Sequence, residues 1–277
     1  CHDPIEDAMR SPFRFLTTFA SAMLVASFCP AQEKKEIRDD FKKLFESYRV
    51  EGSFALYDLK NDSYLFCNEA QFRHPFIPAS TFKICNSLIG LETGVIRDEN
   101  FIIKWDGVVR QVVEWNKDQD LKTAFKNSTV PYYQELARRV GGKRMKYWLD
   151  KAKYGNADTS GGIDRFWLTG GLRVTPEQQI KFLVRLYKND LPFSTKSIDI
   201  VKKIMIAQDT IGFVLRAKTG WSEQDRKSIG WYVGYLETGA GIYFFSTCIQ
   251  CADQENPDFA KARREITLSI LKTLKLL

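Results

Sequence analysis

Histidine is almost absent from this chain, which contains only His2 and His74 among its 277 residues. Zinc sites and Ser-His-Asp triads both need histidine, as a ligand or as a base. His2 precedes the part of the chain that we expect to fold, so either kind of site would depend on His74 alone. The scarcity of histidine argues against metal-dependent hydrolysis, and we expect no bound metal.

No apolar run of the chain is long enough to cross a membrane. The longest, residues 15–28, follows Met9 and two arginines and leads to small residues near Ala31. This order is typical of a secretory signal peptide. We therefore expect residues 1–31 to comprise upstream residues and a signal cleaved near Ala31. The product would be periplasmic, with no stable membrane anchor.

Charge of one sign is not concentrated anywhere. The chain has 41 Lys and Arg against 34 Asp and Glu, a net charge of +7, and the basic residues are spread rather than grouped in blocks. This spread argues against a nucleic-acid partner. A mildly positive pocket would suit an anionic small-molecule substrate. The sequence leaves the oligomeric state open between monomer and homodimer.

Cysteine is also scarce. Four of the six cysteines follow the predicted signal: Cys67, Cys85, Cys248 and Cys251. The last two form a CxxC pair at the end of a strand-like run, and no second such pair accompanies it. This context argues against a redox or zinc role. An exported protein can form disulfides, but the sequence does not choose a pairing.

The patterns along residues 32–277 indicate a single α+β domain, sandwich-like in its layers. Alternating segments predict strands at 52–68 (a hairpin), 211–217, 228–237 and 241–248. Amphipathic helices are expected near the two ends, over 33–49 and 259–276. Together these elements predict an antiparallel sheet flanked by terminal helices. A mostly helical subdomain, roughly residues 95–205, is expected at the edge of the sheet and includes a helix over 176–187 capped by Thr175.

Ser80 and Lys83 are the most informative pair of residues. They begin a predicted helix over residues 81–92, so their side chains share one face. A serine nucleophile needs a base, and a lysine is in reach. Ser80 would also cap the helix, whose N-terminus favours developing negative charge. A second Ser-x-x-Lys match, Ser269 to Lys272, falls on the solvated side of the C-terminal helix, and we interpret it as coincidental.

Further motifs follow Ser80 in a fixed order. They are Ser128-Thr129-Val130, Tyr154-Gly155-Asn156, Trp167 and Lys218-Thr219-Gly220-Trp221. Together with Ser80-x-x-Lys83, they resemble the signature of the class D (oxacillinase-type) serine β-lactamases. The resemblance extends from about residue 36 to residue 277. It implies the serine β-lactamase/penicillin-binding fold and hydrolysis of β-lactam antibiotics through a serine acyl-enzyme, which gives antibiotic resistance.

The resemblance implies a role for each member of the first motif. Ser80 would be the nucleophile, and Lys83 the general base. In the family this lysine takes up carbon dioxide, from bicarbonate, to become a carbamate (N6-carboxylysine), and no other cofactor is implied. The indole N–H of Trp167 would donate to the carbamate. Phe82, Val130 and Trp167 would form the apolar surroundings that lower the pKa of Lys83.

The later motifs would handle the leaving nitrogen and the substrate. Ser128 would pass a proton to the β-lactam nitrogen as the ring opens. Val130 departs from the Ser-Asp-Asn pattern of class A enzymes, which favours class D. Lys218 would supply positive potential near Ser128, Thr219 would bind the substrate carboxylate, and Gly220 would let the substrate approach the backbone.

Two further groups would contact the substrate. The backbone N–H groups of Ser80 and Trp221 would form the oxyanion hole. Arg263, in the last helix, would pair with the substrate carboxylate. Arg264 follows immediately, so the sequence leaves the register between the two arginines open by one residue.

Two other functions use the same motifs. One is a β-lactam-sensing domain, which deacylates very slowly and normally follows a large membrane module. The other is a penicillin-binding transpeptidase, which usually carries Ser-x-Asn where this chain has Ser128-Thr129-Val130. We favour the hydrolase over both. The sequence does not reveal the range of β-lactams, carbapenems included.

Overall fold

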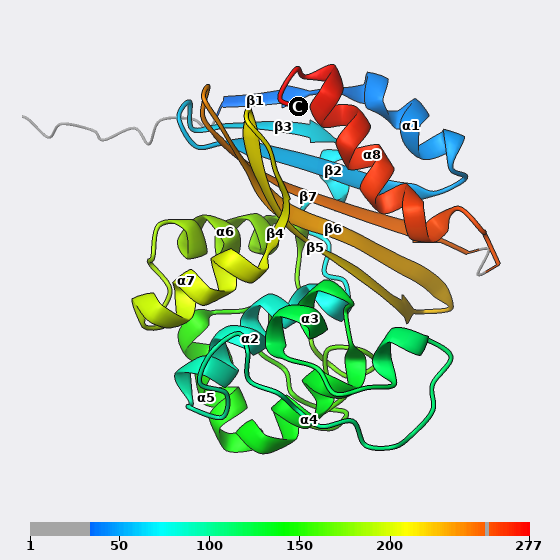
Figure 1. Ribbon diagram of the computed structural model, residues 1–277. Coiled ribbons are helices and arrows are strands. Elements are labelled where there is room, and N and C mark those ends of the chain that lie inside the picture. Colours follow the sequence, from blue (N-terminus) through cyan, green and yellow to red (C-terminus); the bar gives the residue numbers. More distant parts are fainter. Residues whose placement is uncertain (1–33, 253–254) are drawn as a thin grey trace, which may run out of the picture. The chain divides into compact units, whose positions relative to one another are not determined.

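The computed structural model describes residues 34–252 and 255–277 (Figure 1). The described residues form one compact unit. The predicted signal peptide and its cleavage site lie outside the described residues. In the described ranges no helix is long and apolar enough to cross a membrane.

The sheet has seven strands in the order β1-β3-β2-β7-β6-β5-β4. Their bounds are β1 Lys34–Ile37, β2 Glu51–Asp58, β3 Ser63–Cys67, β4 Ile206–Asp209, β5 Phe213–Gln224, β6 Lys227–Thr238 and β7 Ile242–Cys251. All neighbouring pairs are antiparallel except β1 and β3, which are parallel. The sheet is therefore mixed, and the predicted antiparallel sheet was wrong at this one edge.

The parallel edge arises where the sequence predicted a helix over 33–49. The chain there forms β1, a 3-10 turn η1 (Asp39–Phe41) and a short helix α1 (Lys42–Ser47). Phe41 and Phe45 are buried at helical spacing, but Ile37 is 48% exposed. Strand β1 is held by backbone hydrogen bonds to β3. All four of its side chains are exposed, so they show no alternation of buried and exposed residues that could have predicted a strand.

Local sequence accounts well for β2, β3, β5, β6 and β7, whereas it did not predict β4. The predicted hairpin over 52–68 is β2 and β3, whose turn is closed by the Asp58 carboxylate accepting from the N–H groups of Lys60 and Asn61 at 2.9 and 3.1 Å. The three predicted strands near the C-terminus are β5, β6 and β7. Strands β5 and β7 extend several residues beyond the predicted end, because pairing with β6 continues there, whereas β6 ends one residue after the predicted end.

The helices cover both faces of the sheet. They are α2 Lys83–Glu92, α3 Leu121–Lys126, α4 Val130–Val140, α5 Gly142–Ala152, α6 Pro176–Tyr187, α7 Thr195–Ile204 and α8 Phe259–Thr273. Helices α1 and α8 lie over one face, and α2 to α7 gather on the other side (Figure 1). The predicted helix over 176–187 is confirmed as α6, with a capping box in which Thr175 and Gln178 satisfy each other's backbone N–H groups.

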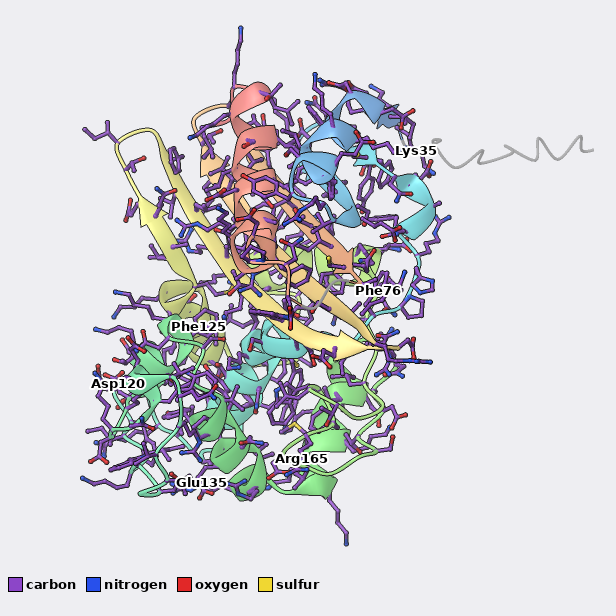
Figure 2. All side chains as sticks on the ribbon, turned by 90° about the vertical axis from the view of Figure 1, so that its right-hand side faces the viewer. Lys35, Phe76, Asp120, Phe125, Glu135 and Arg165 are labelled. Carbon is purple, nitrogen blue, oxygen red and sulfur yellow. The ribbon has the colours of Figure 1, made fainter. Side chains whose placement is uncertain are left out.

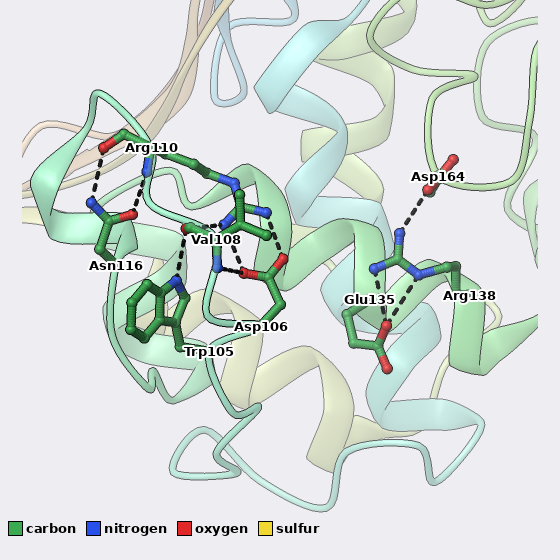
Figure 3. A network of polar contacts seen from close by, with 8 residues as sticks. All are labelled: Trp105, Asp106, Val108, Arg110, Asn116, Glu135, Arg138 and Asp164. Carbon is green, nitrogen blue, oxygen red and sulfur yellow. Dashed lines mark hydrogen bonds and ion pairs between the residues drawn. The ribbon is translucent and has the colours of Figure 1, made fainter.

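The prediction of mostly helical structure over roughly residues 95–205 was wrong in two long stretches. Residues 101–120 form an irregular loop with only one 3-10 turn, η4 (Val113–Trp115), and residues 153–175 are also irregular. Side chains satisfy the backbone of the first loop: Asn116 bonds both ways with the backbone of Arg110, and Asp106 accepts from the Val108 N–H and pairs with the Arg110 guanidinium (Figure 3). Such side chain–backbone bonds compete with helix formation.

Candidate active site

Ser80 lies in the 3-10 turn η3 (Ala79–Phe82), directly before helix α2. The prediction that Ser80 caps this helix was wrong, because no side chain caps either element. Instead, Lys83 Nζ donates a hydrogen bond of 2.6 Å to Ser80 Oγ. In a 3-10 turn, side chains three residues apart lie above one another, which brings these two groups together.

The backbone just before the candidate nucleophile is held in an unusual conformation. Ala79 has a φ of 50°, in the left-handed region that residues with a Cβ rarely adopt. Its N–H donates to the Trp167 carbonyl at 3.0 Å. The Thr81 hydroxyl donates to the Pro78 carbonyl at 2.7 Å and accepts from Gln179 Nε2 of α6 at 2.8 Å. These buried contacts keep the turn in place.

Lys83 is a fully buried lysine, 0% exposed. Burial, and then the charge of Lys218, hold its pKa well below the usual range. Its Nζ lies 5.2 Å from the centroid of the Tyr133 ring. No acidic side chain in the described part of the chain raises its pKa. Burial therefore favours the neutral amine, the form that can accept a proton from Ser80.

Trp167 packs against the turn that carries Ser80. Trp167 is fully buried, and its ring centroid lies 5.3 Å from that of Phe82. Its Nε1–H has no hydrogen-bond partner among the described residues. Val130, the first residue of α4, is half-buried. An unpaired buried donor is costly, so Trp167 is a candidate to bind a group that is not part of the chain.

Ser128 is brought to Lys218 from the end of α3. Lys218 Nζ, from strand β5, donates to Ser128 Oγ at 3.0 Å and to the Thr219 carbonyl at 3.1 Å. Burial, and then the charge of Arg263, lower the pKa of Lys218 to about 7. Its Nζ also lies 5.6 Å from the ring of Phe125, which stands where the helical part meets the sheet (Figure 2). This lysine can thus change its protonation near neutral pH.

Gly220 meets a different requirement from the one we expected. A Cβ on it would lie 3.0 Å from the Pro78 carbonyl oxygen and 3.2 Å from Thr81 Cγ2. The glycine therefore lets strand β5 pack closely on the turn that carries Ser80. Close approach of a substrate to this residue stays a prediction. Thr219 is half-buried on the same strand.

Arg263 reaches the same strand from helix α8. Its Nη1 donates to the Gly220 carbonyl, and its guanidinium lies 5.9 Å from the centroid of the Trp221 ring. Burial lowers its pKa to about 10. Arg264, the neighbouring arginine that the sequence could not distinguish from Arg263, is exposed. Trp221 is 47% exposed, so a large apolar surface stands at this side of the site.

The comparisons with known proteins agree on one family. The model of the penicillin binding protein transpeptidase domain matches residues 52–272. The chain is 38% identical over 259 residues to Beta-lactamase OXA-48 of Klebsiella pneumoniae, covering 94% of this chain and 96% of that protein. The crystal structure of the class D β-lactamase YbXI from Nostoc matches with a TM-score of 0.82 and 46% identity, over 86% of this chain and 99% of that one. The chain belongs to the class D β-lactamases.

This class D β-lactamase also resembles a receptor domain. The C-terminal domain of the Bacillus licheniformis BlaR penicillin-receptor matches with a TM-score of 0.83 and 32% identity, over 90% of this chain and 100% of that one. Similarity of fold alone therefore does not separate an enzyme from a receptor.

Sequence reasoning missed several residues around the site of this class D β-lactamase. Tyr133 lies three residues after Val130 on α4, so helical spacing could have placed it near Lys83. Gln179 and Phe125 left no comparable signal, because their contacts depend on the packing of α6 and α3 against distant segments.

The four cysteines and the side chains that could bind a metal form no second site in the described part of the chain. Cys67, Cys85, Cys248 and Cys251 are all buried and free. In the described ranges, no group of His, Cys, Asp and Glu side chains could hold a metal ion.

Proposed function

We propose that this protein hydrolyses β-lactam antibiotics through an acyl-enzyme on Ser80. Ser80 Oγ attacks the lactam carbonyl carbon while its proton passes to the base at Lys83. A C–O bond forms and the lactam C–N bond breaks. Water then attacks the ester, releasing the ring-opened acid and restoring the Ser80 hydroxyl. The observation that carries this proposal is the 2.6 Å contact between Ser80 Oγ and the buried Lys83 Nζ.

The leaving nitrogen needs a proton as the ring opens. Ser128 Oγ gives its proton to that nitrogen and is reprotonated through Lys218, to which it is hydrogen-bonded at 3.0 Å. A lysine whose pKa is about 7 gives up and regains a proton readily at neutral pH. This relay needs no histidine.

The substrate is held by charge and by backbone donors. The N–H groups of Ser80 and Trp221 form the oxyanion hole, a stabilisation of about 3–4 kcal/mol per donor in comparable enzymes. Arg263 and Thr219 bind the substrate carboxylate, since both reach the segment of β5 beside Gly220. The exposed ring of Trp221 contacts the substrate's side chain.

The surroundings of Lys83 fit a carbamate. Carbon dioxide bound to Lys83 Nζ, with loss of a proton from the amine, would supply an anionic oxygen as the general base. Burial favours the neutral amine, which is the form that takes up carbon dioxide. Trp167 Nε1, a buried donor with no partner in the described part of the chain, suits an anionic oxygen. A carbamate signal in 13C NMR with labelled bicarbonate, absent in Lys83→Met, would support this assignment. Its absence from the wild type would overturn it.

Time-resolved mass spectrometry with a penicillin tests the proposed function. We expect an adduct that appears on Ser80 and clears over many turnovers. Ser80→Ala should form none, whereas Ser269→Ala, in the second Ser-x-x-Lys match, should behave as wild type. A wild-type protein with neither adduct nor product would overturn the proposal.

The alternative function is a β-lactam sensor, which the similarity to the BlaR domain favours. An adduct on Ser80 that persists, with about one equivalent of product, would support it. We also propose that the protein is exported to the periplasm, where β-lactams meet their targets. Mass spectrometry of the protein from a periplasmic extract tests this through its N-terminus, expected near Ala31.

A further inference from the structure

Thr129 occupies a capping position but does not cap. It is the N-cap residue of α4, where threonine normally accepts a hydrogen bond from the helix's first turn. No such bond forms; instead the Thr129 hydroxyl donates to Gln119 Oε1 at 2.7 Å. Thr129 forgoes the favourable capping bond and bonds to a distant residue instead. This choice indicates that its side chain meets another structural requirement at this position.

Gln119 is a firmly anchored partner. Its backbone forms a bridge with Ile103, with N–O distances of 3.0 and 3.3 Å, and its Nε2 donates to the Glu114 carbonyl at 2.5 Å. Gln119 is 4% exposed and Thr129 is 2% exposed. A buried hydrogen bond between two anchored groups restricts both, because breaking it takes away the partner of the Thr129 hydroxyl and of the Gln119 amide oxygen. We name this pair the Gln119–Thr129 clamp.

The clamp lies directly beside a strained catalytic serine. Ser128 has a φ of 54°, and its N–H and that of Thr129 donate to the carbonyls of Phe125 and Ala124. This is the Schellman arrangement that ends a helix, and its left-handed position normally holds glycine. A serine stands here instead, and its hydroxyl meets Lys218. The strained backbone would relax unless its neighbours held it.

We propose that Gln119 and Thr129 are positioning residues that hold Ser128 Oγ in line with Lys218 during acylation. The inference rests on the proposed function. In acylation the lactam C–N bond breaks and the nitrogen takes its proton from Ser128. In deacylation, water cleaves the ester on Ser80 and no proton goes to that nitrogen. Loss of the clamp therefore slows acylation and leaves deacylation unchanged.

Single-turnover kinetics with a penicillin separate the two steps. Gln119→Leu and Thr129→Val both remove the hydrogen bond of the clamp with little change in shape, and Gln119→Leu also removes the bond to the Glu114 carbonyl. We expect each to lower the acylation rate constant at least about tenfold, with deacylation unchanged. Because the two residues act through one bond, the double variant should be no slower than the slower single variant. Thr129→Ser keeps the hydroxyl and should acylate close to the wild-type rate.

A matched control is Thr93→Val, which removes a threonine hydroxyl that bonds to its own helix at the end of α2. It should leave both rate constants at wild-type values. If the wild type acylates and the clamp variants acylate at the same rate, the clamp proposal is overturned but the proposed function is not. An equal loss in both steps, with lowered thermal stability, also overturns the clamp proposal, because that result reports general damage. A wild type that forms no adduct overturns the proposed function and the clamp with it.

Discussion

The core between the sheet and helices α1 and α8 is built mainly from apolar side chains, whereas the core on the other side of the sheet surrounds two lysines. On the first side, the buried hydroxyls of Thr247 and Thr267 satisfy each other at 2.6 Å. On the second side, Lys83 and Lys218 are buried without acidic partners in the described part of the chain.

Unpaired and strained groups occur within the lysine-bearing core. Asn86 Oδ1 and Trp167 Nε1 are buried there without a partner among the described residues. Ala79 and Ser128 have left-handed backbones there. The comparison indicates that one core supplies stability, while the other gives up stability for reactive groups.

The largest effect is expected from Lys83→Met. Removal of the base should lower the acylation rate constant by about 10²–10⁴-fold. The same change should raise the free energy of unfolding by about 1–2 kcal/mol, because a buried amine is replaced by an apolar side chain of similar length. Burst kinetics and urea unfolding measure the two effects. Lys272→Met, on the exposed face of α8, should change neither; a less stable Lys83→Met protein would contradict the comparison.

The opposite pattern is expected from Phe245→Ala, in the core beneath α8. Phe245 is fully buried, so the cavity should lower the free energy of unfolding by about 3–5 kcal/mol. The turnover number per folded molecule should stay at the wild-type value. Urea unfolding and active-site titration with a slow substrate give these two quantities. A fall in turnover per titrated site would show that the two cores are coupled.

Trp167→Phe keeps an aromatic ring in place but removes the unpaired N–H. We expect deacylation to slow by about 100-fold, as when one preorganised donor is lost from a site. The free energy of unfolding should stay at the wild-type value, because the Trp167 N–H has no hydrogen-bond partner to lose among the described residues. Acyl-enzyme lifetime, followed by mass spectrometry, measures the effect. Trp148→Phe, on α5, is the control, and unchanged deacylation in Trp167→Phe would remove Trp167 from the mechanism.

The pH dependence of stability should report Lys218. Its folded pKa of about 7 lies below the usual 10.5, so between these values the unfolded chain binds more protons than the folded one. Stability therefore rises as the pH rises from about 7 to 10. In Lys218→Met this contribution, on the order of a few kcal/mol, should vanish. Urea unfolding at several pH values tests it: the variant's advantage over wild type should be larger at pH 7 than at pH 10, and an equal advantage would contradict the shifted pKa.

The smallest effect is expected from Gly220→Ala. The added methyl would lie within 3.0 Å of the Pro78 carbonyl and would push the turn that carries Ser80. We expect a loss of about 1 kcal/mol in stability and a severalfold slower acylation. Gly239→Ala, whose added methyl meets nothing within 4 Å, is the control. Wild-type acylation in Gly220→Ala would show that the turn tolerates displacement.

Sequence patterns predicted those elements whose stability is local. The helix at 176–187 has its capping box in sequence, and the hairpin at 52–68 has its turn residue, Asp58, in sequence. The same reasoning was wrong for residues 33–49, because an exposed edge strand is selected by the backbone of its neighbour. It was also wrong for residues 101–120, where Asp106 and Asn116 satisfy the backbone without a helix.

For the site, the spacing of Ser80 and Lys83 determined that a hydroxyl and an amine would meet, because three residues make one turn. The order of the later motifs determined the family. Only the tertiary structure decided that Lys218 is buried as well as Lys83, that Arg263 rather than Arg264 reaches β5, and that the Thr129 hydroxyl bonds to Gln119 instead of its helix. These outcomes depend on which distant segments pack around a group and exclude water from it. A pattern of residues that are neighbours in sequence does not contain this information.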